Sequence, residues 1–156
     1  MMEVTLTTAE MLSAALIGMS RHVAALARRL QDNHGYNRDD GWGDHIEGAC
    51  GELAVAKAIG RYWPATVNDF KKGCDVLGCQ VKTRSQHHWD LLVRRDDADD
   101  RIFVLVTGKA PNLIIRGWLP ASECKQPEYL QTYGHREPAW FVPQAKLRPM
   151  DELPPP

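Results

Sequence analysis

The sequence predicts an α/β fold: a central mixed β-sheet flanked by helices, with a long helix near the N-terminus. Apolar residues in the N-terminal part recur at steps of three and four, which is the helical period. Between residues 66 and 119, short segments rich in β-branched and aromatic residues follow one another, as strands do. The 156 residues suffice for one domain with its own core. We therefore expect a single domain over 1–156 with its core at about 43–120.

Composition narrows the class of protein. The net charge of −1 argues against a protein held on nucleic acid by bulk charge, but it allows a local basic cleft. No segment reads as a signal peptide or a membrane span, so we expect no membrane partner. The four cysteines form no CxxC pair and lie in apolar or strand-like surroundings. These features predict reduced thiols and a cytoplasmic location.

The first predicted helix runs from about Ala9 to Leu30. Thr7 and Glu10 have the spacing of a capping box, with Thr7 as the N-cap. One apolar stripe follows the helix, and its members are Leu12, Leu16, Met19, Val23, Leu26 and Leu30. The stripe has two interpretations. Either it covers the core, or its heptad-like spacing serves a dimer helix.

The following elements are predicted from turn residues and periodicity. Residues 32–42 are rich in Asn, Asp and Gly and predict a loop, and a second helix should run from about Asp44 to Ile59 and end at Gly60. The expected strands are Thr66–Phe70, Cys74–Leu77, Cys79–Arg84, Leu91–Arg95, Ile102–Thr107 and Leu113–Leu119. The acidic run 96–100 between two of them is expected to be a solvated loop, and short helical or strand pieces are expected near 128–133 and 140–142.

A tight hairpin is predicted at Leu77-Gly78, because glycine tolerates positive φ. Its register would pair Asp75 with Gln80, and cross-strand partners share a face. Asp75, Gln80 and Lys82 would then converge on one face, opposite an apolar face. Oxygen donors beside a lysine are what a Mg²⁺ and phosphate site needs.

Glu52 lies in the middle of the small, apolar face of the second predicted helix, which should pack on the sheet. A buried carboxylate is costly unless it has a partner. A metal ion or Lys82 would supply one, and a structural salt bridge is the alternative.

The order of these segments resembles the PD-(D/E)xK nuclease superfamily, which has a restriction endonuclease-like fold. The resemblance rests on Gly48-Ala-Cys-Gly-Glu52 on a helix, then Asp75, then Gln80-Val-Lys82 on a strand, and it covers about 43–118. The chain looks most like small phage or bacterial members. The resemblance implies that Glu52, Asp75, Gln80 and the Val81 carbonyl bind Mg²⁺ or Mn²⁺. It implies that Lys82 orients the attacking water and stabilises developing charge.

Two positions depart from the superfamily pattern. Gln80 replaces the usual acidic residue, which removes one negative charge from the metal site. Similar Gln-x-Lys variants occur in the Mrr-like group of restriction-endonuclease relatives. Cys74 stands where the superfamily name has a proline.

Contacts to DNA are expected from basic side chains, and from one threonine, around the predicted hairpin. The candidates are Lys71, Lys72, Thr83 and Arg84, with Arg94 and Arg95 further along the chain. Taken singly, each is as compatible with an ordinary solvated side chain.

Three hypotheses of function follow. The first is a metal-dependent nuclease that hydrolyses phosphodiester bonds in DNA. The second is a catalytically silent protein of the same fold that binds DNA or serves in an assembly. The third is a structural homodimer built on the Leu12–Leu30 helix.

Overall fold

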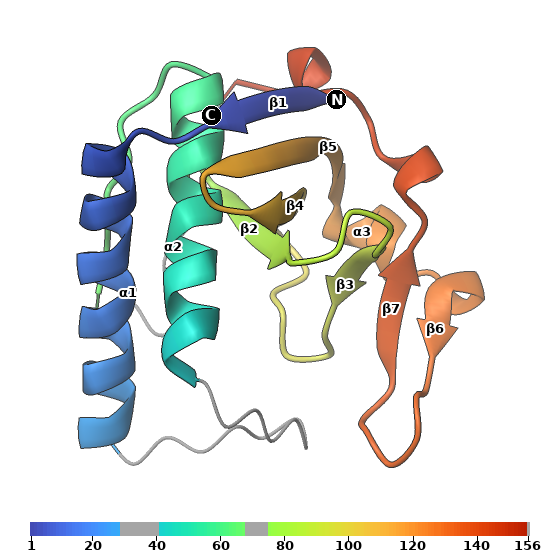
Figure 1. Cartoon of the computed structure of the whole chain (residues 1–156). Helices are drawn as coiled ribbons and strands as arrows, with labels where there is room; N and C mark the ends of the chain where they lie inside the picture. Colours follow the sequence, from blue (N-terminus) through green and yellow to red (C-terminus); the bar gives the residue numbers. More distant parts are fainter. Residues whose placement is uncertain (29–40, 68–74, 156) are drawn as a thin grey trace.

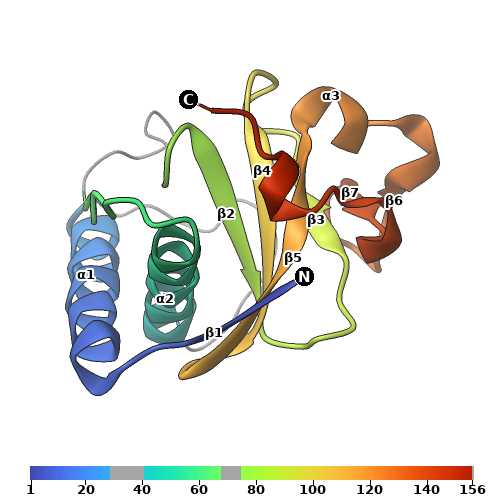
Figure 2. The ribbon, with the colours of Figure 1, turned by 90° about the horizontal axis from the view of Figure 1, so that it is seen from above.

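The computed structural model describes residues 1–28, 41–67 and 75–155. Two helices and two sheets lie side by side as layers (Figures 1 and 2). Helix α1 (Thr8–Ala27) is the outer layer, and α2 (Gly41–Ala58) lies between α1 and the larger sheet. The α/β class and the flanking helices are confirmed.

The larger sheet is mixed and contains the predicted site strand at its edge. Its order is β1-β5-β4-β2, with bounds Met2–Thr5, Asn112–Pro120, Ile102–Lys109 and Cys79–Arg84. Strand β2 runs parallel to β4, whereas the other neighbours are antiparallel. Because β2 is an edge strand, one side of its backbone faces away from the sheet.

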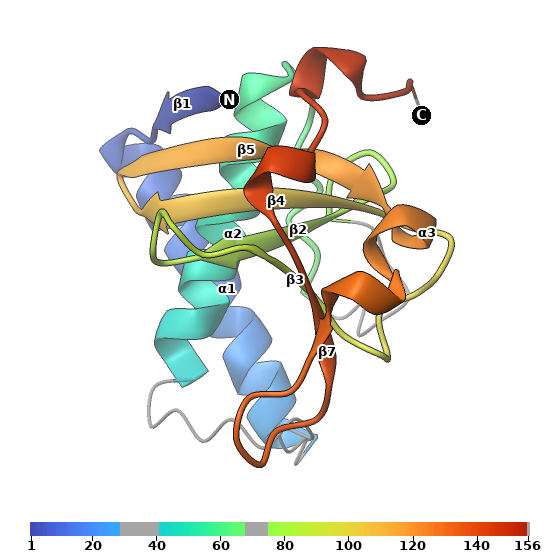
Figure 3. The same cartoon turned by 90° about the vertical axis from the view of Figure 1, so that its right-hand side faces the viewer.

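The smaller sheet is antiparallel and packs on the opposite face of the larger sheet from α2 (Figure 3). Its strands are β3 (Leu91–Val93), β7 (Ala139–Val142) and β6 (Leu130–Gln131), in that order. Short helical turns connect these pieces: α3 at Ala121–Cys124 and 3-10 turns at Pro127–Tyr129, Gln144–Lys146 and Met150–Glu152.

Alternation along β4 builds one core on each face of the larger sheet. Val104 and Val106 belong to the core under α2, whereas Phe103 and Leu105 belong to the core under the smaller sheet. All four are fully buried. Successive side chains on a strand point to opposite faces, so a central strand buried on both faces must be apolar at every position.

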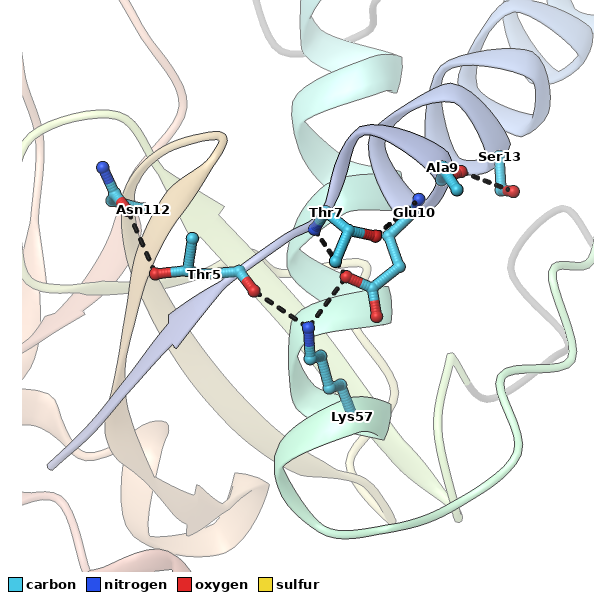
Figure 4. A network of polar contacts seen from close by, with 7 residues as sticks. All are labelled: Thr5, Thr7, Ala9, Glu10, Ser13, Lys57 and Asn112. Atoms are coloured by element: carbon cyan, nitrogen blue, oxygen red, sulfur yellow. Dashed lines mark hydrogen bonds and ion pairs between the residues drawn. The ribbon is translucent and has the colours of Figure 1, made fainter.

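The N-terminus of α1 is fixed by the predicted capping box (Figure 4). The Thr7 hydroxyl accepts a hydrogen bond from the Glu10 amide at 3.3 Å, and the Thr7 amide donates to Glu10 Oε2 at 2.7 Å. Lys57 of α2 donates to Glu10 Oε2 at 2.8 Å and to the Thr5 carbonyl at 2.9 Å. The lysine therefore ties β1, α1 and α2 together at one point, and its ammonium lowers the pKa of Glu10.

The apolar stripe predicted along α1 does not cover the core, so the first of its two interpretations is wrong. Its described members, Leu12, Leu16, Met19, Val23 and Leu26, are 44–64% exposed. Instead α1 turns its small residues Ala14 and Gly18 toward α2, and both are buried. A side chain at Gly18 would lie 2.6 Å from Ile46 Cα, so the two helix backbones approach each other there. Small residues, rather than the leucines, form the helix contact.

The predicted hairpin is confirmed only as a tight turn. Leu77 and Gly78 both have positive φ, 48° and 80°, as a type I′ turn requires. Pairing across the turn is a single bridge between Val76 and Cys79, and the long partner of β2 is β4. Parallel pairing between distant segments leaves no turn signal in the sequence, so it could not be predicted locally.

Other element boundaries differ modestly from the predictions. Residues 66 and 67 are not in a strand, and the rest of the predicted strand Thr66–Phe70 lies outside the described residues, as does Cys74. The strand predicted over Leu91–Arg95 ends at Val93, and β1 was not predicted. Among the described residues, no helix is long and apolar enough to cross a membrane.

We predict that Gly18→Ala lowers the free energy of unfolding by about 1–3 kcal/mol, because the new methyl group would overlap the α2 backbone. The control is Gly48→Ala, where an added Cβ meets nothing within 4 Å. That variant should be unchanged or up to about 1 kcal/mol more stable, since alanine favours helix. Urea denaturation of both variants measures the difference. Equal stability would contradict the close helix contact.

Candidate functional site

Glu52 is buried in α2 and is held by a bidentate salt bridge. Its residue exposure is 5%. Arg21 of α1 donates to Glu52 Oε1 at 2.5 Å and to Oε2 at 2.8 Å, and Trp63 Nε1 donates to Oε2 at 3.0 Å. The partner of Glu52 is therefore Arg21 and not Lys82, which corrects one of the two partners expected from the sequence.

The packing of α2 explains this partner. The helix is covered on both sides, by α1 and by the larger sheet, so it is buried almost all round between Ala49 and Ala56. Gly51 faces β2, because a Cβ there would overlap the Thr83 side chain. Glu52, the next residue around the helix, reaches Arg21 on α1. A single-face wheel does not describe a helix of this kind, which is why Arg21 was missed.

Asp75 lies at the open edge of β2. Its Oδ2 accepts a hydrogen bond from the Val81 amide at 2.7 Å. Within a strand, the N–H and C=O of one residue point to the same side. The Val81 carbonyl therefore faces the same open edge as the Asp75 carboxylate, which supports the predicted grouping of these two oxygens.

The Asp75 and Glu52 carboxylates are close enough to influence one another. Burial, together with the Glu52 charge, raises the pKa of Asp75 to about 6. The Val81 amide, Arg21 and Lys82 act in the opposite direction but do not compensate. The ionised Asp75 carboxylate is therefore disfavoured mainly by its partial burial, and a bound cation would stabilise it.

Gln80 and Lys82 alternate with Val81 and lie on the other face of β2. Gln80 Oε1 is buried and has no hydrogen-bond partner among the described residues. Lys82 Nζ lies 2.7 Å from Asp97 Oδ1 and 5.4 Å from the centre of the Phe103 ring. Glu52 and Asp75 are therefore near neighbours beside β2, and the charge of Lys82 also reaches Asp75, whereas Gln80 and Lys82 lie on the other face of the strand.

Asp97 is a site residue that sequence reasoning missed. It belongs to the acidic run that was expected to be solvated, and the loop is confirmed, but the Asp97 side chain is only 13% exposed. Besides Lys82, it accepts a hydrogen bond from the Arg94 amide at 2.7 Å. Its own amide donates to the Arg94 carbonyl at 3.2 Å, so Asp97 closes a turn that begins at Arg94. Because three other aspartates share this run, no local signal in the sequence distinguishes Asp97 from them.

A cleft of about 1050 Å³ opens beside the second half of β2. Its lining residues come from the N-terminal end of α2, from β2 and from the segment between β6 and β7. The cations on its wall are Lys82, Arg84, Arg94, Arg95 and Arg136, and its aromatic side chains are Trp89, Tyr133 and Phe141. Acidic residues also line it, namely Asp44, Glu47, Asp90 and Glu137.

The predicted DNA contacts have different outcomes. Arg84, Arg94 and Arg95 line the cleft, and the Arg84 guanidinium lies 4.7 Å from the centre of the Trp89 ring. Thr83 also lines the cleft, although its hydroxyl is buried against Gly51. Lys71 and Lys72 lie outside the described residues. Arg136, from a distant segment, was not predicted.

The predicted metal ligands differ in kind from the usual clusters of acidic, histidine and cysteine side chains. Within residues 1–28, 41–67 and 75–155, no three His, Cys, Asp or Glu side chains gather as a metal-binding group. The predicted ligand set is of another kind, with two carboxylates, one amide oxygen and one backbone carbonyl.

Comparison of the chain with protein-family models, with curated proteins and with solved structures finds no match. The chemistry of the site is therefore the basis of the functional argument.

We predict that Asp75→Asn stabilises the metal-free protein at pH 7.5 by about 2–3 kcal/mol. The asparagine amide is neutral, so the cost of holding an ionised carboxylate at this position disappears. An aspartate whose native pKa is raised binds a proton in the folded state that the unfolded state has already lost. Wild-type stability should thus fall as the pH rises from about 4 to 6, the native pKa of Asp75. Denaturation in EDTA across pH 4–8 measures both. Parallel curves for the two proteins would contradict the raised pKa.

Proposed function

We propose that the protein is a metal-dependent nuclease that hydrolyses phosphodiester bonds in DNA. The observation that carries this proposal is the pair of neighbouring carboxylates, the buried Glu52 and the partly buried Asp75, at the edge of β2. The following residues of β2 line a cleft whose wall includes five Lys and Arg side chains, Lys82, Arg84, Arg94, Arg95 and Arg136, together with acidic residues. Arg21 already balances the charge of Glu52, so a bound cation would balance the Asp75 carboxylate, and the cleft offers phosphate contacts beside it.

The donor set fits a hard divalent cation such as Mg²⁺ or Mn²⁺. Asp75 and Gln80 would hold the ion with the Val81 carbonyl, and Glu52 would supply the second negative charge. The buried, unpartnered Gln80 Oε1 supports this assignment, because an orphaned amide oxygen is costly unless a ligand satisfies it. A bound divalent ion would polarise the phosphate and make water a better nucleophile near neutral pH.

The side chains of the chain have separate tasks in this reaction. Lys82 contributes a positive charge where the pentavalent phosphate gains negative charge. Asp97 acts as a positioning residue, because its carboxylate holds the Lys82 ammonium at 2.7 Å. Arg84, Arg94 and other cleft cations would contact the DNA backbone and fix its path past Lys82.

A catalytically silent DNA-binding or assembly protein is the second candidate. The observation that favours it is the saturation of Glu52, which already accepts hydrogen bonds from Arg21 and Trp63. The neutral Gln80 also lowers the affinity of the site for a cation. In this case the cleft would bind DNA and no bond would break.

Metal binding is tested without activity. At a concentration of about 100 times Kd, Mg²⁺ or Mn²⁺ would add about 2.7 kcal/mol to the stability of the folded state. We therefore expect a rise in Tm of about 8 °C for the wild type and for Lys146→Met, an exposed lysine outside the cleft. Asp75→Asn should show no rise. A shift of equal size in all three proteins would place the ion elsewhere.

Cleavage is tested with linear, nicked, branched and single-stranded DNA in Mg²⁺ or Mn²⁺. We predict that Lys82→Met lowers kcat at least about 100-fold, the usual cost of removing a charge-stabilising donor. Lys146→Met should cleave like the wild type. Equal cleavage by wild type, Asp75→Asn and Lys82→Met would indicate a contaminant and reject the site.

DNA binding distinguishes the second candidate. We predict that Arg94→Gln combined with Arg95→Gln weakens binding and lowers the slope of log K against log salt by about 1–2, as expected for one or two lost phosphate contacts. Fluorescence anisotropy at several salt concentrations measures this slope. Binding that depends on these arginines, without cleavage of any substrate, would favour the silent protein. An unchanged slope would remove the cleft from both candidates.

A further inference from the structure

The exposed apolar stripe of α1 is an unusual feature of the surface. We define the α1 stripe as Leu12, Leu16, Met19, Val23 and Leu26, with steps of four, three, four and three residues. This is the a/d spacing of a heptad, with Leu16 and Val23 at a and the other three at d. A stripe of this spacing stays on one side of a helix and matches the seam of a helix pair.

Nothing in the described part of the chain covers this stripe. Helix α1 is the outermost layer of the molecule, on the side of α2 that faces away from both sheets (Figures 1 and 2). Its inner face is already occupied, since Ala14 and Gly18 pack toward α2 and Arg21 binds Glu52. The α1 stripe therefore needs a partner outside this set of contacts.

The residues beside the α1 stripe identify the kind of partner. Within α1, the flanking heptad positions e and g are occupied by Ser13, Ala15, Ser20, His22 and Ala27, and the next g position, Arg29, lies outside the described residues. With no acidic or permanently charged side chain among them, two copies of this face meet without like-charge repulsion. Their mostly small size also allows the helix axes to approach closely.

Other occupants fit this face less well. Nucleic acid needs a row of cations, and an interfacial membrane helix carries lysines and arginines along its polar border. The two arginines of α1 and its C-cap do not form such a row: Arg21 is bound to Glu52, and Arg28 stands at the C-cap. A self-complementary apolar seam points to a second copy of the same chain.

We propose that the protein forms a homodimer through pairing of the α1 stripes of two copies. The α1 stripe has five residues, whereas a standard interface has roughly 20–30 residues on each side. The dimer is therefore expected to be reversible, with a Kd in the micromolar range, rather than obligate. The proposal does not depend on the nuclease assignment.

The test is sedimentation velocity of the full chain from about 1 to 200 µM. The wild type should shift from monomer to dimer across this range. Leu16→Glu, which buries one carboxylate from each copy in the seam, should raise Kd at least 100-fold, and the milder Leu16→Ala should raise it about 10-fold. Leu16 is exposed in the monomer, so circular dichroism and the denaturation midpoint of the dilute protein should not change.

The matched control is Tyr62→Glu, which replaces an apolar residue that is 87% exposed and lies outside the α1 stripe. Its Kd should equal that of the wild type. A wild type that remains monomeric at 200 µM would overturn the proposal. So would a dimer that Leu16→Glu and Leu16→Ala leave intact, because the interface would then lie elsewhere.

Discussion

The ion pair between Arg21 and Glu52 is the interaction on which the arrangement of the helices and the candidate site depends. It joins the outer helix to the inner one, and its carboxylate stands beside Asp75 at the edge of the sheet. Removing one member of a buried pair leaves an uncompensated charge, which costs about 3–5 kcal/mol. A guanidinium rather than an ammonium suits this position, because it donates to both carboxylate oxygens at once.

The edge position of β2 is the second constraint. In a central strand, both sides of the backbone form hydrogen bonds to neighbouring strands. Strand β2 has one side without a neighbouring strand, and there the Val81 amide donates to Asp75. The two cores on either face of the sheet hold this edge in place without covering it. Residues from different layers therefore lie along one strand, with the acidic pair beside its open edge and Lys82 in the wall of the cleft.

Local signals in the sequence predicted local structure well. The capping box at Thr7, the tight turn at Leu77-Gly78 and strand Cys79–Arg84 depend on residues close together in the chain, and the structure has all three. The α1 stripe was assigned to the wrong partner, because periodicity identifies an apolar face but not what covers it. Parallel pairing of β2 with β4 joins segments separated by a loop and by β3, and no turn residue encodes it.

In the candidate site too, local spacing in the sequence was informative and contacts between distant segments were not predicted. Motif spacing selected Glu52, Asp75, Gln80 and Lys82, whereas their partners Arg21 and Asp97 come from segments that only the tertiary fold brings near. Arg21 lies on the face of α1 opposite the leucines, and the periodicity of the leucines carries no information about it. A lone charge within an apolar helix is a signal for a buried partner elsewhere in the chain.

The pairing of β1 with β5 has a consequence for synthesis of the protein. Met2 lies opposite Ile115 and Thr5 opposite Asn112, so β1 pairs with a strand that is synthesised 107 residues later, counted from Thr5 to Asn112. Contacts so distant along the chain raise the contact order and slow folding. During translation the amphipathic α1 helix and strand β1 would therefore emerge long before their sheet is complete, when a chaperone is best placed to bind them.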